Sequence, residues 1–150
     1  MSNPTEQLDI HPITDPFEAD MAAKFIVSEL WHDDILDPEN LAHAKKYLDH
    51  MDELQVGAFD AEGQMVGVAG LAGGSNLGSK EWVLVADVAT AANKQRSGVG
   101  TAVMNAVHDL AKNHGIKEAV IVSPTRAGVA LYERIGYRWD DATRTYRKHL

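Results

Sequence analysis

The sequence has 150 residues, of which 45% are hydrophobic and 24% charged, and its formal net charge is −8 at neutral pH. This size and composition predict one folded domain over residues 1–150 and exclude a largely disordered chain. The acidic excess disfavours nucleic acid as a partner and favours a small cationic amine or a basic peptide as an acceptor. Because cysteine is absent, disulfides, thiolate metal sites and a cysteine nucleophile are excluded.

The sequence shows no targeting or membrane signal. No apolar run approaches the roughly 20 residues that a membrane-spanning helix needs. Met1–His11 is polar and acidic, without the basic and apolar regions of a signal peptide. These features predict a cytoplasmic protein with no membrane partner.

The N-terminal third predicts an edge strand and two helices. Leu8–Thr14 alternates weakly between apolar and polar residues, as an edge strand does. Asp15-Pro16 and Asp37-Pro38 are each typical of a helix start, with aspartate as N-cap and proline at the first helical position. The first helix fades near Trp31. The second, ending near Met51, has a thin apolar stripe and should lie exposed.

After Glu53 the hydrophobic period changes from helical spacing to alternation. The elements expected from there on are three strands, a helix, a short strand, a helix and a closing strand pair: Leu54–Phe59, Met65–Leu71, Trp82–Thr90, Gly98–Asn113, Glu118–Val122, Thr125–Ile135, Tyr137–Trp139 and Thr143–Lys148. The strand at Trp82–Thr90 is strongly apolar and should be central. The order β-α-α-β-β-β-α-β-α-β, with a final strand, predicts an α/β fold with helices flanking a mixed sheet.

The most informative segment is Gln95-Arg96-Ser97-Gly98-Val99-Gly100-Thr101, which joins an apolar strand to an amphipathic helix. Glycines at a helix N-terminus let a phosphate approach unpaired backbone N–H groups, and Gln95 and Arg96 add side-chain donors. A tight structural turn would explain the two glycines equally well. The sequence contains no Walker motif, and Val103 stands where a dinucleotide fingerprint needs its third glycine.

The same segment resembles motif A of the GNAT acyltransferase superfamily, [QR]-x-x-G-x-[GA], as Gln95-Arg96-Ser97-Gly98-Val99-Gly100. Upstream, Val66-Gly67-Val68-Ala69 is similar to the end of that family's hairpin. Downstream, Ala130-Leu131-Tyr132-Glu133-Arg134-Ile135-Gly136-Tyr137 is similar to its "a..lYeklGF" segment. The resemblance covers roughly Leu54–Trp139 in the right order.

The resemblance implies a GNAT-type fold in which two neighbouring parallel strands, here Trp82–Thr90 and Glu118–Val122, splay apart with the help of a bulge in the first. It also implies acetyl-CoA as the acyl donor. Its pantetheine arm would contact Val88, Ala89 and Thr90, and its pyrophosphate would lie on Arg96, Ser97, Gly98, Val99, Gly100 and Thr101. Thr90, Ala92 and Thr125 stand where the family often has valine, proline and a cofactor-contacting asparagine, so these contacts depart from its pattern.

By the same resemblance, the Tyr132 phenol would protonate the leaving thiolate, whereas its alternative role is packing on the sheet. The sequence leaves several candidates for the general base. One is Asp87, which alternation puts on the face opposite Val88, and another is a proton path relayed by water. The remaining candidates are Glu81, His32, Asp33 and Asp34.

These features predict an N-acetyltransferase that moves an acetyl group to a primary amine by direct attack in a ternary complex. The alternative is a non-catalytic acyl-CoA sensor that regulates a partner; a different kind of nucleotide-binding domain lacks its fingerprints. No metal is expected, since His43 and His50, seven residues apart on one predicted helix, lie about 10 Å apart. A homodimer is possible by family analogy.

Overall fold

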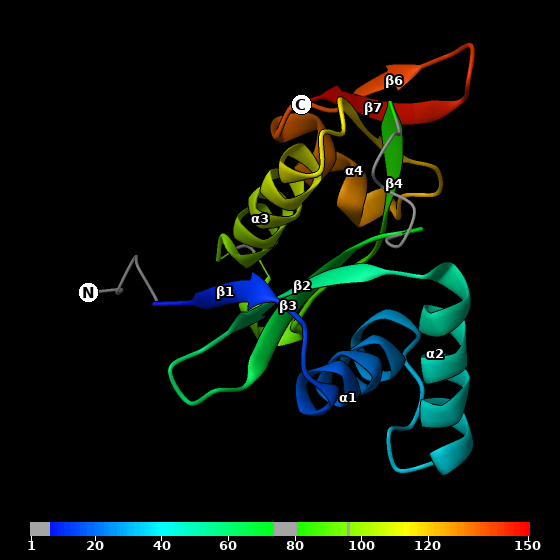
Figure 1. Cartoon of the computed structure of the whole chain (residues 1–150). Coiled ribbons are helices and arrows are strands. Elements are labelled where there is room, and N and C mark those ends of the chain that lie inside the picture. Colours follow the sequence, from blue (N-terminus) through cyan, green and yellow to red (C-terminus); the bar gives the residue numbers. More distant parts are fainter. Residues whose placement is uncertain (1–6, 74–80, 96) are drawn as a thin grey trace.

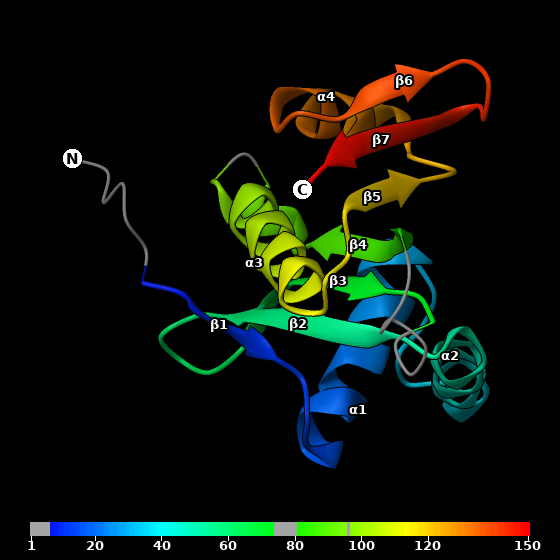
Figure 2. The same ribbon diagram turned by 45° about the horizontal axis from the view of Figure 1, so that its top comes forward.

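The computed structural model describes residues 7–73, 81–95 and 97–150. Within them, one mixed sheet has the strand order β1-β2-β3-β4-β5-β7-β6 (Figures 1 and 2). β4 is the middle strand, as predicted. Only the β4–β5 pair is parallel among the described strand pairs. The strands are β1 Asp9–Pro12, β2 Leu54–Phe59, β3 Met65–Leu71, β4 Trp82–Thr90, β5 Glu118–Ile121, β6 Arg138–Asp140 and β7 Thr145–His149.

Helices cover both faces of the sheet (Figure 1). The first face carries α1 (Pro16–Phe25), the π-helical segment η1 (Ile26–Leu30) and α2 (Pro38–Met51). The opposite face carries α3 (Val99–Asn113), which follows the short 3-10 turn η3 (Ala92–Lys94), and α4 (Arg126–Arg134) lies beside α3. The element order confirms the predicted fold class. No helix within the described ranges has the length and apolarity needed to cross a bilayer.

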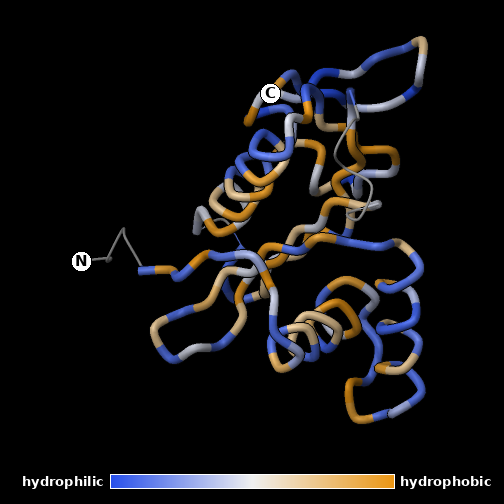
Figure 3. The backbone as a smooth tube through the Cα atoms, in the orientation of Figure 1, coloured by the Kyte–Doolittle hydropathy of each residue, from blue (hydrophilic) through white to orange (hydrophobic). Residues whose placement is uncertain are grey.

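The two faces have separate apolar contacts. On the α3 face, Val56 and Leu71 pack against Val103 of the helix. On the α1 face, Val68 packs with Phe25 and Ile26. Only Ala44 of α2 is buried, so this helix is exposed as its thin stripe predicted, and Figure 3 shows it as mostly hydrophilic.

Both aspartate–proline signatures begin helices. Asp15 accepts a hydrogen bond of 2.7 Å from the Glu18 N–H, and Asp37 accepts one of 3.0 Å from the Glu39 N–H. The edge strand β1 is shorter than predicted at both ends, and β5 ends one residue earlier, at Ile121. The first helix continues as η1 up to Trp31, whose N–H bonds the Ile26 carbonyl at 2.9 Å.

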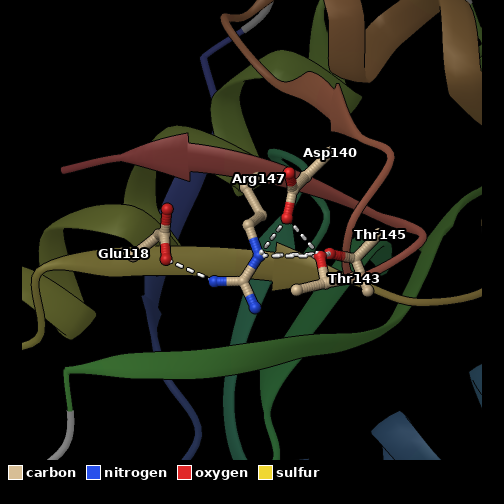
Figure 4. A network of polar contacts seen from close by, with 5 residues as sticks. All are labelled: Glu118, Asp140, Thr143, Thr145 and Arg147. Carbon is tan, nitrogen blue, oxygen red and sulfur yellow. Dashed lines mark hydrogen bonds and ion pairs between the residues drawn. The ribbon is translucent and has the colours of Figure 1, made fainter.

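A polar network ties the closing hairpin to β5 (Figure 4). Arg147 on β7 bonds Glu118 on β5, and its Nε donates to Thr145 Oγ1 at 3.1 Å and to Thr143 Oγ1 at 3.3 Å. Thr143 also donates to Asp140 Oδ2 at 2.5 Å. One guanidinium therefore holds three segments of the C-terminal half of the sheet in register.

Candidate active site

A bulge in β4 sets the geometry of the site. Val68 of β3 pairs with Ala89, and Gly70 pairs with Ala86, so that Ala69 alone stands opposite Asp87 and Val88. Asp87 adopts a left-handed conformation with φ of 53°, which is rare for a residue other than glycine and concentrates at functional sites. The bulge that the family resemblance implied is therefore present.

Beyond this bulge β4 separates from β5. The parallel pairing runs from Trp82 and Glu118 only to Leu84 and Val120, whereas β4 itself continues to Thr90. On the β5 side, the backbone N–H and C=O groups of the last third of β4 thus have no strand partner. Such groups need hydrogen-bonding partners, which an extended ligand can supply.

A cavity of about 820 Å³ opens at the separated strands. Nine of the residues predicted to bind the cofactor line it: Val88, Ala89, Thr90, Gln95, Gly98, Gly100, Thr101, Thr125 and Tyr132. The structure thus brings together residues from β4, the connection to α3, and α4. They include the strand residues predicted for the pantetheine arm and the glycines predicted for the phosphates.

The N-terminus of α3 faces this cavity without a side-chain cap. Gly98 is its N-cap and has φ of 91°, a conformation that favours glycine. Gly100 lies between α3 and α4: a Cβ atom there would stand 3.1 Å from Leu131 Cδ2 and 3.5 Å from Thr90 Oγ1. The first N–H groups of α3, with the positive end of the helix dipole, are suited to an anion beside the separated strands.

Two residues that were predicted to bind the cofactor, Ser97 and Val99, are not among the described residues that line the cavity. The Val99 side chain is buried in the core, although its backbone belongs to the first turn of α3. The Ser97 hydroxyl bonds the Lys94 carbonyl instead. Arg96 lies outside the described residues.

α4 supplies the opposite wall of the cavity. Thr125 is its N-cap and accepts a hydrogen bond of 3.0 Å from the Gly128 N–H. Arg126 and Arg134, which sequence reasoning missed, also line the cavity. The signal that could have found them is two cations on the helix that carries Tyr132. They give this wall positive charge, which suits a ligand that carries phosphate groups.

Tyr132 is 7% exposed and lies where α4 meets the cavity. Burial raises the pKa of its phenol, so that the hydroxyl keeps its proton at neutral pH. Its ring centroid is 5.8 Å from that of Tyr137, whose hydroxyl is 2.6 Å from His108 Nε2 in the core. This packing holds the Tyr132 ring in place beside the cavity that the residue lines.

The candidate bases are placed very differently. Asp87 is on the α1–α2 face, where its Oδ1 accepts a hydrogen bond of 3.2 Å from the Tyr47 hydroxyl, while Val88 packs with the α3 cluster. The two residues therefore lie on opposite faces, as alternation predicted. Glu81 is exposed and pairs with Lys117 at 3.5 Å. His32, Asp33 and Asp34 are exposed in the connection to α2.

The separated strand pair beside the α3 N-terminus defines an α/β protein with a cleft for an extended, anionic ligand. The sequence model described as an acetyltransferase (GNAT) domain matches residues 17–150. The chain therefore belongs to the GNAT acetyltransferase family, and the resemblance in the sequence is confirmed. No curated protein matches the chain significantly.

Solved structures share the fold at low sequence identity. A GNAT-family protein from Desulfovibrio desulfuricans is 17% identical with a TM-score of 0.71. The match covers 95% of this chain and 99% of the Desulfovibrio chain. The N-acetyltransferase YhbS from Escherichia coli, crystallised with CoA, is 20% identical with a TM-score of 0.68. The match covers 99% of this chain and 84% of the YhbS chain. An acetyltransferase from Brucella melitensis, crystallised with acetyl-CoA, is 15% identical with a TM-score of 0.68. The match covers 97% of this chain and 90% of the Brucella chain.

Proposed function

We propose that this protein is an N-acetyltransferase that moves the acetyl group of acetyl-CoA to a primary amine by direct attack in a ternary complex. The observation that carries the proposal is the separation of β4 from β5 beside the uncapped N-terminus of α3. Membership of the family, and relatives crystallised with CoA or acetyl-CoA, support the same donor. We further propose that residues 1–150 act as one acyltransferase domain in the cytoplasm.

The residues around the cavity fit CoA. The backbone of Val88, Ala89 and Thr90 has no strand partner on the β5 side, which suits the amides of a pantetheine arm. The missing side chain of Gly100 keeps the space between α3 and α4 open for the pyrophosphate, which the first N–H groups of α3 would bind. Gln95, Thr125 and the guanidinium groups of Arg126 and Arg134 would add donors at the rim.

Two side chains carry the proposed proton transfers. Asp87 takes a proton from the acceptor ammonium, so that its nitrogen has a free electron pair. The C–N bond then forms as the C–S bond of the thioester breaks, and Tyr132 protonates the departing sulfur. The second proton that the nitrogen loses returns to the Tyr132 oxygen through water, and one proton is released to solvent overall.

The placement of Asp87 supports an acceptor that approaches from the α1–α2 face, opposite the α3 side of the sheet. This face also carries the acidic residues Asp49 and Asp52, which line a pocket between α1 and α2. Negative charge there favours a cationic acceptor, either a small primary amine or a basic peptide end.

Calorimetric titration of acetyl-CoA tests the proposal, with Gly100→Glu as the variant that fills and charges the phosphate site. We expect micromolar binding to the parent and its loss in the variant.

On a panel of amines, Tyr132→Phe should lower kcat by at least about 10²-fold without weakening acetyl-CoA binding. A folded parent that binds no acetyl-CoA would overturn the proposal. Binding without turnover on any amine would instead support the acyl-CoA sensor.

A further inference from the structure

Three buried carboxylate oxygens without partners meet on the α1–α2 face of the sheet. They are both oxygens of Glu53 and Oδ2 of Asp87. The remaining oxygen of the pair, Asp87 Oδ1, accepts the Tyr47 hydroxyl at 3.2 Å. We call Glu53, Asp87 and Tyr47 the carboxyl cluster. Buried oxygens of this kind are costly unless a donor satisfies them, so the cluster needs a donor for these oxygens.

A glycine makes the encounter of the two carboxyls possible. Glu53 directly precedes β2, and its Oε1 lies only 2.0 Å from where a Gly70 Cβ atom would stand. Gly70 is on β3, next to Ala86 of β4. The Glu53 carboxyl therefore lies over β3 in the space left by the missing side chain, within hydrogen-bonding reach of Asp87. Any side chain at position 70 would push it away.

The other charged groups around Glu53 are engaged elsewhere or face the pocket. On α1, Asp20 pairs with Lys24 at 3.1 Å and with Lys45 of α2 at 2.7 Å. Asp49 of α2 and Asp52, which caps the C-terminus of α2, line the pocket that Glu53 and Gln55 also line. Burial first, and then the hydrogen bond and the charge of Asp87, raise the pKa of Glu53 far above its usual range.

Two adjacent buried carboxylates cannot both stay ionised, and one proton between them removes the repulsion. Asp87 is the better anion, because it already receives the Tyr47 hydroxyl. Burial and the charge of Asp87 raise the pKa of Tyr47 to about 12, so that this phenol remains a donor at neutral pH. Glu53 has no donor of its own among the described residues.

We propose that Glu53 is protonated at neutral pH and donates this proton in a hydrogen bond to Asp87 Oδ2, so that Glu53 and Tyr47 position Asp87 as the single anion of the cluster. The buried, unpartnered oxygens and the position of the Glu53 carboxyl over Gly70 support the shared proton. Its consequence for catalysis rests on the proposed function, in which Asp87 is the base. Glu53 is then a positioning residue that acts through Asp87 and touches neither the acyl donor nor the acceptor.

The shared proton is tested without activity, by carbon NMR of protein labelled at the glutamate δ-carbon. In the folded parent at neutral pH, one glutamate resonance should have the shift of a protonated carboxyl. It should vanish in Glu53→Gln and persist in the control Glu62→Gln, which changes an exposed turn residue. A parent with only ionised glutamates, or a protonated signal that survives Glu53→Gln, overturns the shared proton.

The positioning role is tested by the pH profile of kcat/KM on an amine that the parent acetylates. Glu53→Gln keeps a donor for Asp87 and should keep the acid limb of the parent. Glu53→Leu removes the donor, and the acid limb should move to higher pH by about one unit, as expected for one lost hydrogen bond to a carboxylate. An unmoved limb in Glu53→Leu overturns the positioning role. A parent without turnover on any amine overturns it together with the proposed function, while the NMR result stands by itself.

Discussion

The buried His108–Tyr137 pair should make the stability of this protein fall as the pH drops below the ordinary histidine pKa. His108 is 4% exposed, and burial, followed by the charges of Lys148 and Lys112, lowers its pKa from 6.5 to about 4. The folded state therefore holds a neutral imidazole where the unfolded chain binds a proton. A depressed histidine pKa contributes stability that is complete above the unfolded pKa and is lost progressively as the pH falls toward the folded value.

The magnitude follows from the two pKa values. Proton linkage between an unfolded pKa of 6.5 and a folded pKa of about 4 costs about 1.4 kcal/mol at about pH 5.5 and less than about 0.1 kcal/mol at about pH 7.5. The free energy of unfolding should thus fall by about 1.3 kcal/mol between these two conditions through His108 alone. Urea denaturation at both pH values measures it.

Comparison with His108→Gln isolates this contribution from other titrating groups. One of these is His11, whose pKa is raised by Glu18 and then Asp9 and whose contribution therefore has the opposite sign. Glutamine can still bond the Tyr137 hydroxyl but cannot titrate, so the fall should be about 1.3 kcal/mol smaller in the variant. Tyr137→Phe removes the hydrogen bond and leaves His108 buried, so its pH dependence should persist. Equal falls in the parent and His108→Gln would show that His108 does not cause the pH dependence.

Three further predictions concern stability. Gly98→Ala should lower the free energy of unfolding by about 1–2 kcal/mol, because position 98 has a positive φ although a side chain would have space there. Gly98→Asn should lower it by less, and thermal unfolding of both variants measures the difference. Met104→Ala, at a fully buried position, should cost about 2–5 kcal/mol in urea denaturation, and a smaller loss would contradict the tight packing of α3. Arg147→Met should lower the free energy of unfolding by roughly 1–3 kcal/mol, because it breaks the network of Figure 4. If high salt leaves this difference between variant and parent unchanged, the charged hydrogen bond from Arg147 to Glu118 is not its source.

Local sequence signals predicted most of the fold because they act over a few residues. Asp15-Pro16 and Asp37-Pro38 cap helices with their own side chains, and β2, β3 and β4 have the predicted bounds. The π-helical ending of the first helix was not predicted, since apolar spacing does not distinguish it from an α-helical turn.

The site was predicted where its chemistry is local and missed where it depends on strand pairing. Gly98 and Gly100 line the cavity because a strand-to-helix turn needs no distant partner to form. Glu53 could not have been predicted, because its meeting with Asp87 depends on Gly70 lying between them in the folded sheet. The bulge at Asp87 was expected from the family resemblance but not from periodicity, since it exists only relative to the register of β3.

That bulge links the two halves of the proposed site. A regular strand would continue its alternation past Ala86, and a one-residue change of register moves every later side chain to the other face. With one extra residue, β4 places Asp87 on the α1–α2 face beside Tyr47 and still places Val88 and Thr90 at the cavity on the other side. The same irregularity coincides with the stretch in which β4 has left β5. Donor binding and the proposed base therefore depend on one local departure from regular pairing, because regular alternation after Ala86 would place Asp87 on the α3 face and Val88 on the α1–α2 face.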